Sequence, residues 1–578
     1  MKKLRLLTLF IVVLSALVLV AACNRGEEDV SEAATTPAPQ QTPAGHAGQD
    51  PAPPAVEGND DGFPAFMNPV GTLPIVNESV TLSVTVSQLS GFDFDGNPIT
   101  YWFEEQTGVS IDWLQVPQAD WDTRLNLMLA TGDLTDIIVS GVGSHATVYF
   151  YAQLGLFMPI TDYLDPFAPE LMNMFYHLPN IHADMIMPDG HIYGFPSIDD
   201  AFHSSLPQKL WINTAWLDAL GLPMPRTTEE FYDTLVAFRD LDPNQNGRPG
   251  SVLPFAGAAG QGHSIERLLG RFVTTDEGNR LIVENGRIVP VFNTEEWREG
   301  LRFLNRMYTS GLIAPDTFVQ DRSGLRAMGD HPDYNIVGVM PGLWLGQMIT
   351  TDFDNQEGRW NDFRVIPYLI TPDGRQENFT RPLQGNHRAA ITNNLDPELM
   401  PVAVRWLDNF MTEISTLMTI QGQEDVHWRW ADPGTVSIAG GPARWERIIS
   451  PEGGAATNDM WAGQPMPNWR SHDWRLSERA DRSIVEQETL LYDETLVMFP
   501  YRNDLNIIVP VLIFDEVQSA ELVDIQAPIN SFVAENIARF TVGDLCLDDD
   551  WDWYIRELEV MGLSRLLELN QNAFDLRR

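Results

Sequence analysis

The stretch Trp121–Gly141, WDTRLNLMLATGDLTDIIVSG, constrains the fold more than any other. Its first half has the apolar spacing of a helix, and Gly132 stands where a helix needs a left-handed C-cap. Residues 137–139 form a short apolar run, typical of a parallel strand covered on both faces. Because ligands bind outside the carboxyl ends of such strands, the loop at Ser140–Gly141 is a candidate ligand contact. The helical residues that share one face are Leu125, Met128 and Leu129.

The preceding residues extend this unit. Residues 80–86 alternate apolar and polar side chains and predict a strand. A helix is expected next, ending at Gly108, and residues 109–116 predict a second strand. The order strand–helix–strand–helix–strand indicates an α/β fold with a parallel sheet and right-handed crossovers.

Four segments resemble family 1 extracellular solute-binding proteins, and in particular their LipO-like lipoprotein branch. They are residues 121–165, 209–247, 421–428 and 540–575. The resemblance implies a two-lobed, periplasmic-binding-protein-like (type II) α/β fold with a hinge and an interlobe cleft. It also implies a substrate-binding lipoprotein of a bacterial carbohydrate ABC importer.

The amino terminus reads as a lipoprotein signal peptide over residues 1–22. Basic residues precede an apolar run over 6–20, which is short for a transmembrane helix. The sequence Val-Ala-Ala before Cys23 resembles a lipobox, which implies cleavage before Cys23, lipidation with palmitate and an anchor on the extracellular face of the cell membrane. A plain secretory signal with an incidental cysteine is the alternative. The chain has 2 cysteines, so lipidation would leave Cys546 alone.

Residues 23–77 are rich in Pro, Ala, Gly and acids, and predict a disordered tether after the lipidated cysteine. The remaining chain is too long for one core, so two lobes are expected. We assign residues 78–200 and about 381–415 to lobe one, and 201–380 and about 416–578 to lobe two. Crossings between lobes are expected near 197–206 and 380–386.

The charge balance excludes some partners. With 80 Asp and Glu against 37 Lys and Arg, the formal net charge is −43. Nucleic acid and anionic lipid headgroups are therefore poor partners for the folded body.

Asp242, Asn244 and Asn246 have the spacing that opens an EF-hand-like calcium loop. The closing positions of that loop fall on Gly250 and Leu253, which lack side-chain oxygens. A capped turn is the simpler interpretation. We therefore expect no cofactor and no metal, with calcium binding here weak or absent.

No catalytic motif stands out: the chain has no HExxH, GxSxG, CxxC, P-loop or helix-opening GxGxxG. Paired carboxylates of a glycosidase leave no sequence signature, so a secreted carbohydrate-active enzyme stays an alternative, as does a surface carbohydrate-adhesion lipoprotein. The chain contains 17 Trp, whose flat faces suit sugar rings, although packing in a core or at a lobe surface is the better explanation for any single Trp. Those expected in loops are Trp344, Trp428, Trp430, Trp461, Trp469 and Trp474.

We therefore predict a binding protein and not an enzyme. It is expected to be a monomer that captures an oligosaccharide and delivers it to ABC permease subunits. Its only attachment to the membrane is expected to be the lipid anchor. Ligand contacts are expected from loops that follow strands and from exposed aromatics. The candidates are Asp93, Asp95, Ser140, Gly141, Ser144, His145, Trp344, Trp428 and Trp430.

Overall fold

The computed structural model describes residues 64–577, except Ser90, Gln261, Glu277, Asp354, Glu377, 449–457, Asp459 and 462–464. The predicted signal peptide, Cys23 and most of the predicted tether lie outside the described residues. Within the described ranges, no helix combines the length and apolarity that a bilayer crossing requires.

The first sheet has the strand order β11-β3-β1-β2. Strand β1 (Val80–Gln88) is parallel to β2 (Val109–Pro117) and to β3 (Ile137–Ile138). The late strand β11 (Ala390–Ile391) returns antiparallel beside β3. The three predicted early strands are therefore confirmed as one parallel group.

Local signals set the helices of this sheet. Helix α2 (Pro98–Thr107) begins at the Asn97 cap and ends at Gly108, whose φ of 73° is left-handed. Helix α3 (Trp121–Thr131) ends in the same way at Gly132, with φ of 70°. Both ends agree with the sequence expectation.

Both faces of the first sheet are covered. One face packs on α2, α5 (Thr161–Phe167), α6 (Pro169–His177) and α13 (Met400–Asn409). The opposite face packs on α3 and α4 (His145–Gln153). Double coverage explains why residues 137–139 are continuously apolar.

The second sheet has the order β10-β5-β9-β6. Strand β5 (Leu210–Asn213) lies antiparallel to β10 (Phe363–Val365) and to β9 (Val337–Pro341). Strand β6 (Leu253–Phe255) is parallel to β9.

Helices α8 (Thr214–Leu220), α9 (Thr228–Asp240), α11 (Glu295–Thr309) and α12 (Arg322–Gly329) surround this sheet. Helix α9 begins with a capping box formed by Thr227 and Glu230. Strands β7 (Leu281–Glu284) and β8 (Arg287–Pro290) form an antiparallel hairpin.

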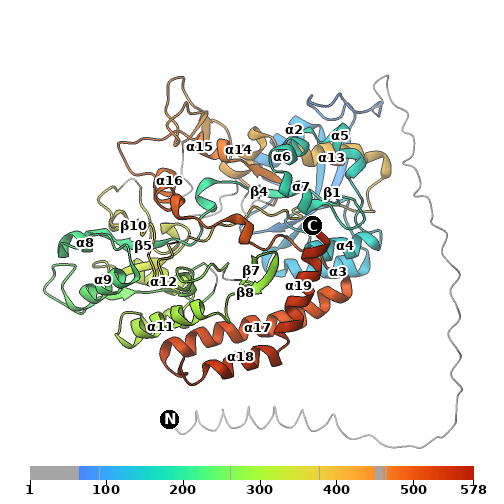
Figure 1. Cartoon of the computed structure of the whole chain (residues 1–578). Coiled ribbons are helices and arrows are strands. Elements are labelled where there is room, and N and C mark those ends of the chain that lie inside the picture. The colour runs from blue at the N-terminus through green and yellow to red at the C-terminus, as the bar shows by residue number, and fades with distance from the viewer. Residues whose placement is uncertain are drawn as a thin grey trace, which may run out of the picture. The chain divides into compact units, whose positions relative to one another are not determined.

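The chain ends in three helices: α17 (Glu516–Val542), α18 (Trp551–Val560) and α19 (Leu563–Arg577). They form the red group in Figure 1, where α17 also lies along α11. Their apolar residues join the core of the second sheet. At the end of α19, the Arg577 guanidinium pairs with Asp184 of the first lobe.

The two segments where we expect the chain to cross between lobes lie side by side. Asn386 bonds both backbone groups of Ser197, and the Arg381 N–H donates to the Ser205 carbonyl at 2.8 Å. A third segment joins them, because β14 (Asn468–Arg470) is parallel to β4 (Ser197–Asp199).

Residues 416–578 divide between the two cores. Helix α14 (Glu413–Gln421), β12 (Trp428–Trp430), β13 (Trp445–Arg447) and α15 (His472–Leu476) pack into the core of the first sheet. Helix α16 (Gln487–Met498) packs with the second sheet. We had expected about 416–578 to belong to lobe two. We now propose that lobe one extends to about residue 476, because Trp428, Trp445 and Trp474 are buried in its core.

Residues 64–77, which we call the entry strap, fold onto the first lobe. Met67, Ile75 and Val76 of the strap are buried in its core. The guanidinium of Arg405, on α13, donates to four strap carbonyls. The folded body therefore begins about 14 residues before the expected boundary at 78.

Candidate ligand-binding site

A pocket of about 270 Å³ opens at the carboxyl ends of the three parallel strands of lobe one. Leu89 follows β1, Gln118 follows β2 and Ser140 follows β3. This is the edge at which open α/β sheets bind ligands. The pocket is lined by Ser87, Leu89, Gln118, Trp121, Asp122, Ser140, Arg388 and Pro465.

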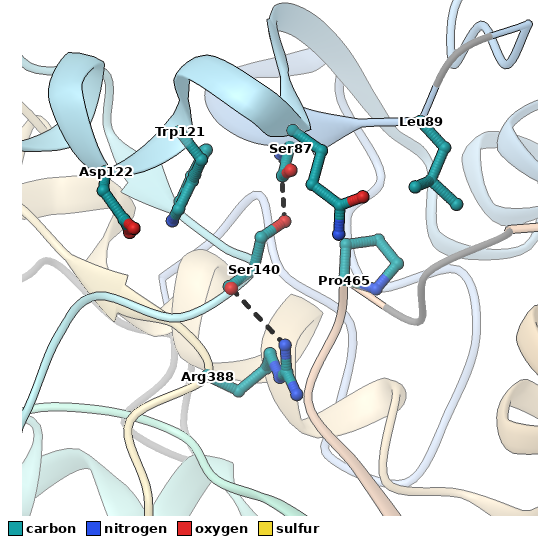
Figure 2. A pocket seen from close by; sticks show the side chains of 8 residues that line it. Ser87, Leu89, Trp121, Asp122, Ser140, Arg388 and Pro465 are labelled. Carbon is teal, nitrogen blue, oxygen red and sulfur yellow. Dashed lines mark hydrogen bonds between the residues drawn. The ribbon is translucent and has the colours of Figure 1, made fainter. Parts of the chain in front are cut away.

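Ser140 connects the parts of this pocket (Figure 2). Its φ of 78° is left-handed, which is unfavourable for a serine. Three contacts hold it there. Its N–H donates to the Pro465 carbonyl at 2.8 Å, its Oγ accepts from the Ser87 N–H at 3.0 Å, and its carbonyl accepts from Arg388 Nη1 at 3.4 Å.

Arg388 belongs to the chain segment that returns from lobe two. Its backbone N–H donates to Phe195 at 2.9 Å, and its carbonyl accepts from Gly141 at 2.8 Å, so the backbone is fixed between two loops of lobe one. The side chain is half-buried, and its Nε has no hydrogen-bond partner among the described residues. Burial lowers the pKa of this guanidinium below its usual value.

The first turn of α3 supplies the aromatic part of the pocket. Trp121 is half-buried beside Asp122, and both line the cavity in Figure 2. An indole face with nearby amide, hydroxyl and carboxylate groups matches the mixed surface of a sugar ring, which has apolar C–H faces and polar edges. The arrangement is suited to binding, and these lining residues contain no nucleophile–base pair.

Known proteins similar to this chain bear on the conclusion that the pocket is suited to binding. Residues 95–309 match the model of the family "Bacterial extracellular solute-binding protein". Over these residues the chain is similar to bacterial extracellular solute-binding proteins.

This chain is also similar to two curated proteins. It is 27% identical over 525 residues to the fructooligosaccharide ABC transporter substrate-binding protein FusA of Streptococcus pneumoniae, covering 87% of this chain and 91% of FusA. It is 30% identical over 230 residues to lipoprotein LipO of Bacillus subtilis, covering 39% of this chain and 43% of LipO. Both relatives are named as transport or lipoprotein components and neither as an enzyme.

Solved structures confirm the fold. The structure of FusA in complex with kestose superposes with a TM-score of 0.70, at 24% identity over 86% of this chain and 99% of FusA. This chain therefore has the predicted two-lobed type II α/β fold.

The pocket contains one of the nine ligand contacts expected from sequence, Ser140. Gly141 is its neighbour and bonds Arg388 through the backbone. Ser144 caps α4 by accepting from the Thr147 N–H at 3.2 Å. His145 packs edge-on against His387, with ring centroids 4.7 Å apart.

The remaining candidates are not among the residues that line this pocket. Asp93 and Asp95 both accept from Gln115 Nε2, at 2.8 and 3.1 Å. Trp428 is fully buried and donates to the Gly422 carbonyl at 2.8 Å, while Trp430 is 45% exposed beside it. Trp344 follows β9 in lobe two and is partly buried against the core there.

Sequence reasoning did not single out Trp121, Arg388 or Pro465. The rule that ligands meet the carboxyl ends of strands could have found Ser87, Leu89 and Gln118, which end β1 or follow β1 and β2. No sequence signal links residues 388 and 465 to them, because this contact exists only in the folded chain.

The calcium-like loop lacks the side-chain oxygens that would close a calcium site, because its ninth and twelfth positions are Gly250 and Leu253. Both Asp242 carboxylate oxygens accept backbone N–H groups, from Asn246 at 3.2 Å and Gly247 at 2.6 Å. The side-chain Oδ1 of Asn244 accepts from the Trp216 indole N–H at 3.0 Å, and Oδ1 of Asn246 accepts from the Arg248 N–H at 3.0 Å. These oxygens are used as in a capped turn. Across the described residues, no group of three or more His, Cys, Asp or Glu is placed to hold a metal.

Proposed function

We propose that this protein captures an oligosaccharide outside the cell and delivers it to the permease of an ABC importer. One observation carries the proposal: the pocket lies where the carboxyl ends of the lobe-one strands meet Arg388, next to the crossings between lobes. Hinge motion about these crossings would open and close the site. The name of FusA, aligned over nearly its whole length, supports a sugar of several units.

In this proposal the lobe-one wall consists of Trp121, Ser140 and Arg388. Trp344 is the proposed opposing wall, because it follows the carboxyl end of β9 in lobe two as Ser140 follows β3 in lobe one. Closure would then enclose a sugar ring between two indole faces. Trp428 is better explained as a core residue.

We also propose that lipid on Cys23 anchors the protein, as a monomer, on the extracellular face of the cell membrane. The motif before Cys23 and the likeness to LipO support this. Cys23→Ala should leave the precursor unprocessed or release the protein into the medium. Membrane retention of a cleaved Cys23→Ala protein would contradict the anchoring proposal.

The binding proposal is tested by thermal shift and calorimetry of the purified protein against neutral and acidic oligosaccharides. A ligand at 100 times its Kd should stabilise the fold by about 2.7 kcal/mol. The ligand should be recovered intact, since a binding protein does not cleave it. Absence of binding across both sugar classes, or release of shortened sugars, would contradict the proposal.

A further inference from the structure

Arg388 brings a positive charge to the pocket that the protein does not neutralise. Its one side-chain hydrogen bond joins Nη1 to the Ser140 carbonyl at 3.4 Å, which is long for a charged donor. Among the described residues no carboxylate forms an ion pair with it, and its buried Nε has no partner. A half-buried charge without a partner is costly, so such groups are usually paired.

The surroundings of Arg388 add positive charge. Arg470, on the strand that begins three residues after Pro465, is close enough that its pKa is lowered by burial and, to a smaller extent, by Arg388. Asp199, which lies beside Arg470, is already used by it, with Nη2 2.9 Å from Oδ2. Asp122 lines the same pocket but lies outside ion-pair distance of Arg388. The guanidinium is therefore free to pair with a ligand.

The lack of a carboxylate partner for Arg388 is not explained by a shortage of acidic residues. The chain contains 80 Asp and Glu against 37 Lys and Arg. Elsewhere two buried arginines pair with carboxylates: Arg475 Nη2 lies 2.6 Å from Glu488, and Arg280 Nη2 lies 2.8 Å from Glu266. Two other buried arginines, Arg271 and Arg405, instead donate to several neutral oxygens of the protein. An unpaired arginine at a pocket of such an acidic protein indicates that the partner comes from outside.

We infer that the ligand carries a carboxylate, and that this pocket recognises an acidic, uronate-containing oligosaccharide through Arg388. The planar guanidinium matches a carboxylate with two parallel hydrogen bonds. Trp121 would contact the sugar ring and Arg388 its acid group. This inference rests on the proposed function and departs from the neutral fructooligosaccharide named for FusA.

The test compares two matched ligands by calorimetry on the purified full-length protein. One is a trimer of galacturonate, and the other is the galactose trimer with the same linkage, in which a CH₂OH group replaces each carboxylate. Kestose and inorganic phosphate are added as further probes. The wild type should bind the galacturonate trimer at least tenfold more tightly than either neutral sugar.

Arg388→Gln should weaken binding of the galacturonate trimer at least tenfold more than it weakens binding of the neutral trimer. Its melting temperature should stay the same or rise, because an unpaired charge is removed from a half-buried position. Arg322→Gln is the matched control: Arg322 is an exposed arginine at the first position of α12, and its loss should alter neither affinity.

The remaining outcomes separate the two proposals. Tight binding of a neutral sugar that Arg388→Gln does not change would overturn the acidic-ligand inference and leave oligosaccharide binding intact. Binding of phosphate alone, lost in Arg388→Gln, would overturn it in favour of a phosphorylated solute. Binding of no sugar at all would overturn the proposed function together with this inference.

Discussion

The side chain of Asn386 pairs with the backbone of Ser197 across the two chain crossings. Its Nδ2 donates to the Ser197 carbonyl at 2.7 Å, and its Oδ1 accepts from the Ser197 N–H at 3.0 Å. One amide thereby satisfies both backbone groups of the residue at which β4 begins. The pairing joins the two segments at which we expect the chain to cross between lobes, where the proposed hinge rotation would occur.

Asn386→Ala should weaken this coupling. It removes two hydrogen bonds and leaves two half-buried backbone groups unpaired, so the free energy of unfolding should fall by roughly 1–3 kcal/mol. Denaturant unfolding measures this. Asn394→Ala is the control, because exposed Asn394 makes one side-chain bond, 2.9 Å to Asp136, and its loss should cost less than about 0.5 kcal/mol. Equal stabilities of the two variants would contradict a special role for Asn386.

Two tryptophans should respond in opposite ways. Trp121→Ala should weaken ligand binding by about 1–3 kcal/mol, as aromatic platforms do for other flat ligands, with little change in melting temperature. Trp428→Ala should instead destabilise the fold by about 3–5 kcal/mol, because a fully buried indole leaves a cavity. Calorimetry and thermal melting of both variants check this. A Trp428→Ala protein that is as stable as the wild type but binds ligand poorly would show that Trp428 contacts the ligand.

His387 should make stability depend on pH. It is 3% exposed, and neither ring nitrogen has a hydrogen-bond partner among the described residues. Burial lowers the pKa of His387 to about 3, and neighbouring His145 adds to the shift. Since an unfolded histidine titrates near 6.5, its stability contribution is complete above that pH and is lost as pH falls toward 3.

The slope of that loss should reach about 1.4 kcal/mol per pH unit for one proton. His387→Phe should remove this part of the pH dependence of the unfolding free energy between pH 6.5 and 4. His177→Phe, which replaces an exposed histidine, should leave the slope as in the wild type. Identical slopes in all three proteins would show that His387 does not stay neutral in the folded state.

Removal of calcium should have no effect on stability. Backbone and indole N–H groups already occupy side-chain oxygens of Asp242, Asn244 and Asn246. Melting curves with a chelator and with millimolar calcium should therefore coincide. A fall of many degrees with chelator, reversed by calcium, would show that the loop rearranges around the ion.

Short-range signals predicted the fold well. Gly108 and Gly132 end their helices through local conformation, and each lies where the sequence placed it. The Asn285–Gly286 turn is similar, since both residues adopt the positive φ, 51° and 78°, that such a hairpin needs. These signals are local, so tertiary packing did not have to be known.

The site and the tail were less predictable because they depend on distant pairing. The loop at Ser140 was found because strand ends are visible in sequence. Its partners Arg388 and Pro465 lie about 250 and 325 residues later and reach it only through the return of the chain. Trp428 lies at the end of a segment that resembles the family, and we expected it in a loop. In the structure it is buried in the lobe-one core, where its large apolar side chain contributes to packing.

The clasp between Arg405 and the entry strap has a mechanical consequence. The guanidinium holds the strap carbonyls of Asn68, Pro69, Thr72 and Ile75 against α13. Any tension from a membrane-attached amino terminus would thus be borne by lobe one and would bypass the crossings. Lobe one would then stay nearly fixed relative to the membrane, and opening or closing of the site would move mainly lobe two. The two lobes would therefore present themselves to the permease differently, one at a fixed position and the other over a range of positions.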